Sequence, residues 1–198
     1  IEMDRQYNTK LYILHLNTKE EIELVKNAKA EGVQVHAEVT PHHLFLSEAD
    51  YERLGTKAQM NPPLRTQEDC EALWQGIKDG VVDTIGTDHA PHTLEEKNKP
   101  YGEAPSGIPG IETYLPLLLN AYNENKISLE KIVGLTSTNP QKLFGLEQNS
   151  DWVIVDLDLE REVKDEDLKT KCGWSPFTGM KLKGWPVVTV LNEKVIIL

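Results

Sequence analysis

The chain has 198 residues, a length that suits one globular domain with or without a small appendage. Apolar residues make up 39% of it, and no segment approaches the roughly 18 consecutive apolar residues of a membrane-spanning helix, so we expect no membrane role. The formal net charge of −11 and the scattered lysines make nucleic acid an unfavourable partner.

The two cysteines, Cys70 and Cys172, lie far apart and outside any C-x-x-C spacing. Neither a disulfide framework nor a zinc knuckle is indicated, and a reducing cytoplasm is the expected location. The chain opens at Ile1 without a secretory signal pattern. The absence of an initiator methionine suggests that residues upstream have been removed.

The first elements predict a βαβ unit. Residues 11–16 form an apolar run that predicts a strand, and Thr18 with Glu21 three positions later is typical of a capping box at a helix start. The helix should end near Gly32, and the β-branched alternation of residues 33–39 predicts the next strand.

A loop containing Pro41 is predicted next, followed by a short helix from Ser47. Thr66, with Asp69 three positions later, opens another predicted helix that reaches Gly80. The buried strand predicted at residues 82–87 then runs directly into Asp88.

After a loop rich in Gly, Pro and Lys, helices are predicted from about residue 111 to 122 and near Ser128 and Asn139. Alternating strands and helices predict an α/β fold with a parallel sheet, either a barrel or a doubly wound sheet. From residue 151 the sequence changes to short strand-like pieces, so we expect residues 1–150 to form the α/β part and residues 151–198 an all-β part.

Two residues of metal-ligand type follow predicted parallel strands at their carboxyl ends, where α/β barrels build active sites. These are His15 and Asp88. Imidazole and carboxylate are usual zinc ligands. The alternatives are that His15 is a hydrogen-bonded core histidine and that Asp88 only caps a turn.

Three further segments have both a functional and a structural interpretation. The prolines after Asn61 favour an extended geometry that presents its amide to a ligand, or simply a rigid loop. The stretch around Ser106 and Gly107 offers backbone N–H groups to an anion, or links to the next helix. His42 and His43 follow a proline, and turn or packing roles are favoured for both.

Four motifs occur in a fixed order along the chain: Thr40-Pro41-His42-His43-Leu44, Asn61-Pro62-Pro63-Leu64-Arg65, Thr87-Asp88-His89-Ala90-Pro91-His92-Thr93 and Gly107-Ile108-Pro109-Gly110-Ile111-Glu112. Together they resemble the dihydroorotases of the bacterial and multifunctional-complex class. The resemblance runs from about Leu11 to the C-terminus. It implies a (β/α)8 metallohydrolase barrel that holds a zinc pair, together with a small β-sandwich. Residues 1–150 would be the carboxyl-terminal half of the barrel, and residues 151–198 part of the sandwich.

The resemblance also implies roles for individual residues. His15 and Asp88 match metal ligands, and Asp88 would be the catalytic carboxylate that moves a proton from the attacking water to the leaving nitrogen. Asn61, His92 and the Ser106-Gly107 backbone would contact the substrate. The implied reaction is the reversible hydrolysis of dihydroorotate to N-carbamoyl-L-aspartate in pyrimidine biosynthesis.

The remaining metal ligands of the family are expected upstream of Ile1, so the chain alone should be inactive. Allantoinase and dihydropyrimidinase are near alternatives, and His92 favours an acidic substrate. A non-catalytic homologue that serves as a structural partner of aspartate transcarbamoylase is a further alternative. A homo-oligomer is also expected.

Overall fold

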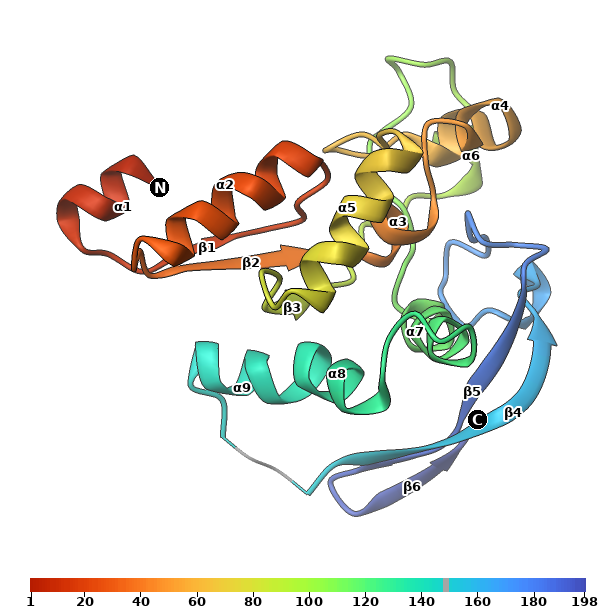
Figure 1. Cartoon of the computed structure of the whole chain (residues 1–198). Helices are drawn as coiled ribbons and strands as arrows, with labels where there is room; N and C mark the ends of the chain where they lie inside the picture. Colours follow the sequence, from red (N-terminus) through yellow and green to blue (C-terminus); the bar gives the residue numbers. More distant parts are fainter. Residues whose placement is uncertain (148–149) are drawn as a thin grey trace. The chain divides into compact units, whose positions relative to one another are not determined.

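The computed structural model describes residues 1–147 and 150–198, which form two compact units, Ile1–Gly110 and Ile111–Leu198. The first unit carries a parallel sheet and the second an antiparallel sheet (Figure 1). The predicted α/β class is therefore confirmed. The predicted change at residue 151 from barrel to sandwich stays a prediction.

The first unit contains three parallel strands in the order β1-β2-β3, as the sequence predicted. Its elements are α1 Glu2–Tyr7, β1 Leu11–Ile13, α2 Lys19–Ala30, β2 Val35–Val39, α3 Pro41–Phe45, α4 Asp50–Leu54, the 3-10 helix η1 Gly55–Ala58, α5 Gln67–Lys78, β3 Thr84–Ile85 and α6 Leu94–Lys97. In register, Leu11 pairs with Val35 and Glu38 with Thr84. The strands β1 and β3 are shorter than predicted.

Helices α2 and α5 begin at the capping boxes that the sequence predicted. Thr18 accepts from the backbone N–H of Glu21, and Thr66 does the same for Asp69, with each acidic side chain reaching back. The two helices pack on each other so closely that a Cβ atom on Gly76 would lie 2.8 Å from Ile22 Cδ1. Glycine at this position therefore fixes the spacing of the two helices.

The core of this unit includes the alternate residues Val35, Ala37 and Val39 of β2, each at most 2% exposed. The residues between them, His36 and Glu38, are only partly buried. This period of two distinguishes the face of the strand that packs in the core from the face that carries polar side chains.

Several short helices were missed by the sequence analysis, among them α1, α3 and α6. Pro41 begins α3 instead of lying in a loop, because proline is tolerated at the first position of a helix, where its missing N–H is not needed. Thr93 and Glu96 form a capping box that opens the one-turn helix α6. Helix α3 directly follows β2, and α6 begins at Leu94, beyond the segment with Asp88 that follows β3.

The second unit combines helices with the antiparallel sheet β4-β5-β6. Its elements are α7 Tyr114–Asn123, α8 Leu129–Val133, the π-helix η2 Gly134–Thr138, α9 Asn139–Phe144, β4 Trp152–Glu162, the 3-10 helix η3 Asp165–Asp167, β5 Lys181–Leu191 and β6 Lys194–Ile197. The amide of Asn123 in α7 donates to the carbonyls of Leu157 and Lys183 at 3.0 and 2.9 Å. A single side chain thus joins the helix to two strands.

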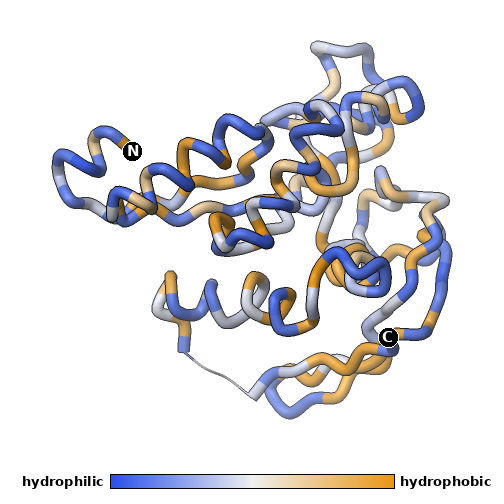
Figure 2. Tube along the Cα trace, viewed as in Figure 1, coloured by the Kyte–Doolittle hydropathy of each residue, from blue (hydrophilic) through white to orange (hydrophobic). Residues whose placement is uncertain are grey.

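Several apolar side chains of this sheet remain exposed, and Figure 2 shows the sheet as hydrophobic where β6 lies along the adjoining parts of β4 and β5, with hydrophilic stretches in the rest of β4 and β5. Trp152 is 52% exposed, Val195 66% and Ile197 83%. Across residues 1–147 and 150–198, no helix has both the length and the apolar character needed to cross a membrane.

The two cysteines lie in different surroundings, which predicts different reactivity. Cys70 is 4% exposed, its thiol donates to the carbonyl of Leu46, and burial raises its pKa to about 11. Cys172 is partly exposed. Since the thiolate is the reactive form, iodoacetamide at pH 8 should label Cys172 and leave Cys70 unlabelled until the chain unfolds. Peptide mass spectrometry measures this, and rapid native labelling of Cys70 would contradict it.

Candidate functional site

Three residues with metal-ligand side chains follow the three parallel strands at the same edge of the sheet. His15 follows β1, His42 lies in α3 just after β2, and Asp88 follows β3. The backbone N–H of Leu16 donates to Glu38 O at 2.8 Å, so the segment that carries His15 is fastened to β2. The sequence prediction that His15 and Asp88 share one edge is confirmed by the parallel pairing.

His15 and Asp88 both have a left-handed backbone conformation, with φ angles of 38° and 45°. For residues other than glycine this conformation costs on the order of 1–3 kcal/mol and is concentrated at functional sites. The left-handed His15 also turns the chain out of the strand direction, so β1 cannot continue to residue 16 as predicted.

His42, for which the sequence favoured a turn or packing role, lies beside Asp88. Its side chain is only 2% exposed, and Nε2 lies 3.9 Å from Asp88 Oδ2. This buried nitrogen has no hydrogen-bond partner among the described residues. Buried polar atoms are normally paired, so an unpaired nitrogen that faces a carboxylate indicates a position for a ligand. Burial, with smaller effects of His43 and His15, lowers the pKa of His42 far below its usual range, which keeps the imidazole neutral.

The adjacent His43 has a different, structural role. Its Nε2 donates to the carbonyl of Pro62 at 3.1 Å, so Nδ1 is the acceptor for the hydroxyl of Thr40 at 2.8 Å. Burial lowers its pKa to about 4. With both ring nitrogens engaged, His43 holds the loop that carries Asn61, and the packing role expected from the sequence agrees with this geometry.

The segment that carries Asn61 is held from several sides. The amide of Asn17, just beyond β1, donates to Pro63 O at 2.8 Å, and the N–H of Leu64 donates to the hydroxyl of Tyr51 at 3.0 Å. Asn61 itself is exposed, and its peptide bond to Pro62 is cis. The loop backbone is therefore fixed while the Asn61 side chain remains accessible.

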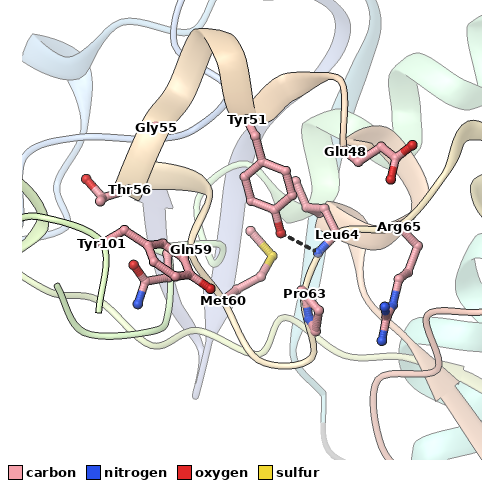
Figure 3. A pocket seen from close by; sticks show the side chains of 10 residues that line it. All are labelled: Glu48, Tyr51, Gly55, Thr56, Gln59, Met60, Pro63, Leu64, Arg65 and Tyr101. Atoms are coloured by element: carbon pink, nitrogen blue, oxygen red, sulfur yellow. Dashed lines mark hydrogen bonds between the residues drawn. The ribbon is translucent and has the colours of Figure 1, made fainter. Parts of the chain in front are cut away.

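A pocket of about 590 Å³ lies beside this segment (Figure 3). It is lined by Glu48, Tyr51, Gly55, Thr56, Gln59, Met60, Pro63, Leu64, Arg65 and Tyr101. None of the three ligand-type residues at the strand ends is among them. The pocket therefore borders the candidate substrate loop and is separate from the residues that would hold a metal.

The other predicted substrate contacts lie together in the same unit. His92 Nε2 lies 3.0 Å from Ser106 O and carries the proton, because a carbonyl can only accept. Gly107 is packed so tightly that an added Cβ would lie 2.7 Å from Ala90 O, and its N–H already donates to Gln59 O at 3.0 Å. Ser106 is exposed, so it is the part of this loop open to a ligand.

The described residues contain no group of three or more His, Cys, Asp or Glu side chains placed to hold a metal ion. His42 Nε2, which has no hydrogen-bond partner within residues 1–147 and 150–198, and the facing Asp88 nevertheless fit the chemistry of a divalent metal, because neutral imidazole and carboxylate are its common ligands.

Comparison with known proteins matches the chain to a protein family and to curated relatives. A model described as "Amidohydrolase family" matches residues 2–196. Dihydroorotases of Staphylococcus epidermidis and Bacillus cereus are each 42% identical, over 93% of this chain and 45% of their own length. The chain thus spans about half the length of these curated relatives.

Solved structures resemble the chain as well. The L-hydantoinase (dihydropyrimidinase) from Arthrobacter aurescens aligns with a TM-score of 0.93 and 32% identity, over 99% of this chain and 46% of that one. The inactive dihydroorotase-like domain of a Chaetomium thermophilum CAD-like multifunctional protein aligns with a TM-score of 0.78 and 28% identity, over 98% of this chain and 53% of that one.

Proposed function

Since the chain belongs to the amidohydrolase family, we propose that it forms the carboxyl-terminal half of a zinc-dependent dihydroorotase. The observation that carries this proposal is the buried Nε2 of His42, which has no hydrogen-bond partner in the described part of the chain. It faces Asp88 at the edge of the sheet where His15 also lies. The three parallel strands would be part of a (β/α)8 barrel, and the antiparallel sheet part of a β-sandwich. Barrel enzymes build their sites at this edge.

His15, His42 and Asp88 would hold zinc, together with ligands from the amino-terminal half. The sequence analysis counted only His15 and Asp88, and the structure supports adding His42. Bound zinc would polarise the ring carbonyl and activate water for attack. The depressed pKa of His42 suits this role, because a metal ligand must be neutral imidazole.

Asp88 would accept the proton of the attacking water and pass it to the leaving ring nitrogen. Its side chain is 37% exposed, so substrate and water can reach the carboxylate. Asn61, on its fixed loop, would orient the ring. The backbone N–H of Ser106 would face the substrate carboxylate, since an N–H donor suits an anion. His92, whose Nε2 donates to Ser106 O, would lie beside the carboxylate.

Two alternative functions each rest on a particular observation. The high TM-score to a hydantoinase favours hydrolysis of a neutral cyclic ureide, while the higher identity to dihydroorotases and the presence of His92 favour the acidic substrate. The similarity to an inactive dihydroorotase-like domain favours a non-catalytic role, with aspartate transcarbamoylase as a candidate partner.

The edge strands β1 and β3 suit association with further strands, as in a closed barrel or a homo-oligomer.

The test compares this chain with a complete enzyme, meaning the chain joined to the amino-terminal half that its relatives carry. The complete enzyme should hydrolyse dihydroorotate and cyclise carbamoyl aspartate in a zinc-dependent manner, and the chain alone should not, because it lacks the remaining ligands. Ring opening followed by absorbance, with the mass of the chain verified as 22.4 kDa, measures both.

Three results would change the proposal. Zinc-dependent turnover by the chain alone would mean that residues treated as structural, His36 first among them, complete the site. Faster turnover of dihydrouracil or allantoin would move the substrate assignment to the related enzymes. A complete enzyme that binds zinc and turns over none of these substrates would support the scaffold role.

A further inference from the structure

Lys97 is a charged residue in the interior of the first unit. It ends the one-turn helix α6, and its side chain is 0% exposed, which is rare for lysine. Burial lowers its pKa to about 8. Keeping a lysine in such a place has a cost in free energy, and that cost calls for a compensating set of interactions.

The ammonium group is placed among three backbone carbonyls. Nζ donates to Gln59 O at 3.0 Å, to Pro105 O at 2.8 Å and to Gly107 O at 3.0 Å. An ammonium group has three N–H donors, and these three acceptors match that number. The contacts span two segments that are far apart in sequence.

Both segments carry candidate substrate contacts. Gln59 precedes Asn61 by two residues, while Pro105 and Gly107 are the neighbours of Ser106 on either side. Lys97 therefore fixes the peptide that precedes the exposed Ser106 and the peptide that follows Gly107, and connects both to the Asn61 loop. The side-chain amide of Gln59 adds a parallel link by donating to Ala104 O at 2.7 Å.

The bond to Pro105 has an electronic effect on Ser106. The carbonyl of Pro105 and the N–H of Ser106 belong to the same peptide group, so an ammonium group on the oxygen polarises the N–H and makes it a stronger donor. The buried positive charge also favours an anion near Ser106, because few water molecules screen it. A neutral ligand would gain little from either effect.

We propose that Lys97 is a positioning residue that holds and polarises the Ser106 loop for an anionic substrate. This inference rests on the proposed function, because the anion is the carboxylate of the dihydroorotate ring. Lys97 does not touch the substrate; it acts through the Pro105–Ser106 peptide and through the connection to the Asn61 loop.

The test uses Lys97→Met in the complete enzyme, because methionine keeps an apolar chain of similar length without the ammonium group. Lys99→Met, an exposed lysine two residues further along, is the matched control. We expect the KM for dihydroorotate to rise about tenfold or more in Lys97→Met while kcat changes less than about threefold, and neither to change in Lys99→Met. A purely structural role would not separate KM from kcat.

Hydrogen exchange gives a readout that does not depend on turnover. Amide protection in peptides covering residues 104–108 and 59–61 should fall in Lys97→Met, while α2 keeps its protection. Lys97→Gln, which keeps two N–H donors without the charge, should retain more of the loop protection and still raise KM.

The outcomes separate the two proposals. If the wild-type complete enzyme fails to act on dihydroorotate, the proposed function fails, and exchange at residues 104–108 still decides whether Lys97 holds the loop. Unchanged exchange, or a loss of kcat at constant KM, would overturn the positioning role. Loss of protection throughout the first unit in both Lys97 variants would assign the lysine to the fold alone.

Discussion

Replacing Asp88 with asparagine is expected to abolish dihydroorotate turnover by the complete enzyme while leaving the fold intact. The amide has nearly the same shape, but it can neither accept the proton nor supply the negative charge that zinc prefers. Loss of general acid–base catalysis alone reduces a rate by about 10²–10⁴-fold. Turnover at saturating substrate, together with the melting temperature, measures both parts of this prediction.

Asp83 provides the matched control, because it is an aspartate just before the same strand. Its Oδ2 accepts from the N–H of Ala37 at 2.8 Å and from Lys29 Nζ at 2.6 Å, so its role is structural. Asp83→Asn should lower the free energy of unfolding by about 1–3 kcal/mol and leave kcat nearly unchanged. Turnover of Asp88→Asn within a few fold of wild type would remove Asp88 from the mechanism.

Replacing His42 with leucine is expected to remove zinc from the complete enzyme without destabilising its metal-free form. Leucine fills the buried site and eliminates a nitrogen that has no hydrogen-bond partner among the described residues, so the metal-free fold loses no bond at Nε2. The stabilisation from zinc, about 4 kcal/mol at a thousand-fold excess over its Kd, should decrease strongly. Metal analysis and thermal unfolding with and without zinc measure the two effects.

His43→Leu is the control for this substitution. It removes the bonds to Thr40 and Pro62, so it should destabilise the metal-free protein and loosen the Asn61 loop. Zinc content should change less than in His42→Leu. Full zinc occupancy and activity in His42→Leu would show that His42 is not a ligand and would return the count from this chain to His15 and Asp88.

Much of the first unit could be predicted because its signals are local. The capping boxes at Thr18 and Thr66 span three residues each, and both helices begin where these boxes predict. Strand β4 was harder to predict, because it continues from Trp152 to Glu162, while the sequence predicted only short strand-like pieces from residue 151 onward. The second half of the strand lacks the apolar pattern by which a strand is recognised in a sequence. It contains charged residues after Val155, and its pairing is irregular between Asp156 and Glu160.

The candidate site was only partly predictable, because the roles of its residues depend on distant partners. His42 and His43 are adjacent and chemically identical, yet one faces Asp88 and the other Pro62. The sequence does not show which neighbour each ring will face. Lys97 follows two glutamates, so its sequence suggests a solvated charge, and only the folded chain shows that it is buried.

The bond from Asn17 to Pro63 joins residues 46 positions apart, and this separation has a consequence for the order of folding. Closing a loop of this length costs much more chain entropy than forming a capping box, which joins residues only three positions apart. We therefore expect such long-range contacts to form after the helices that lie between the two residues in the sequence. The edge of the sheet that carries His15 and the Asn61 loop therefore becomes organised late. We therefore expect a newly made chain to acquire most of its helical content before the candidate site takes its shape.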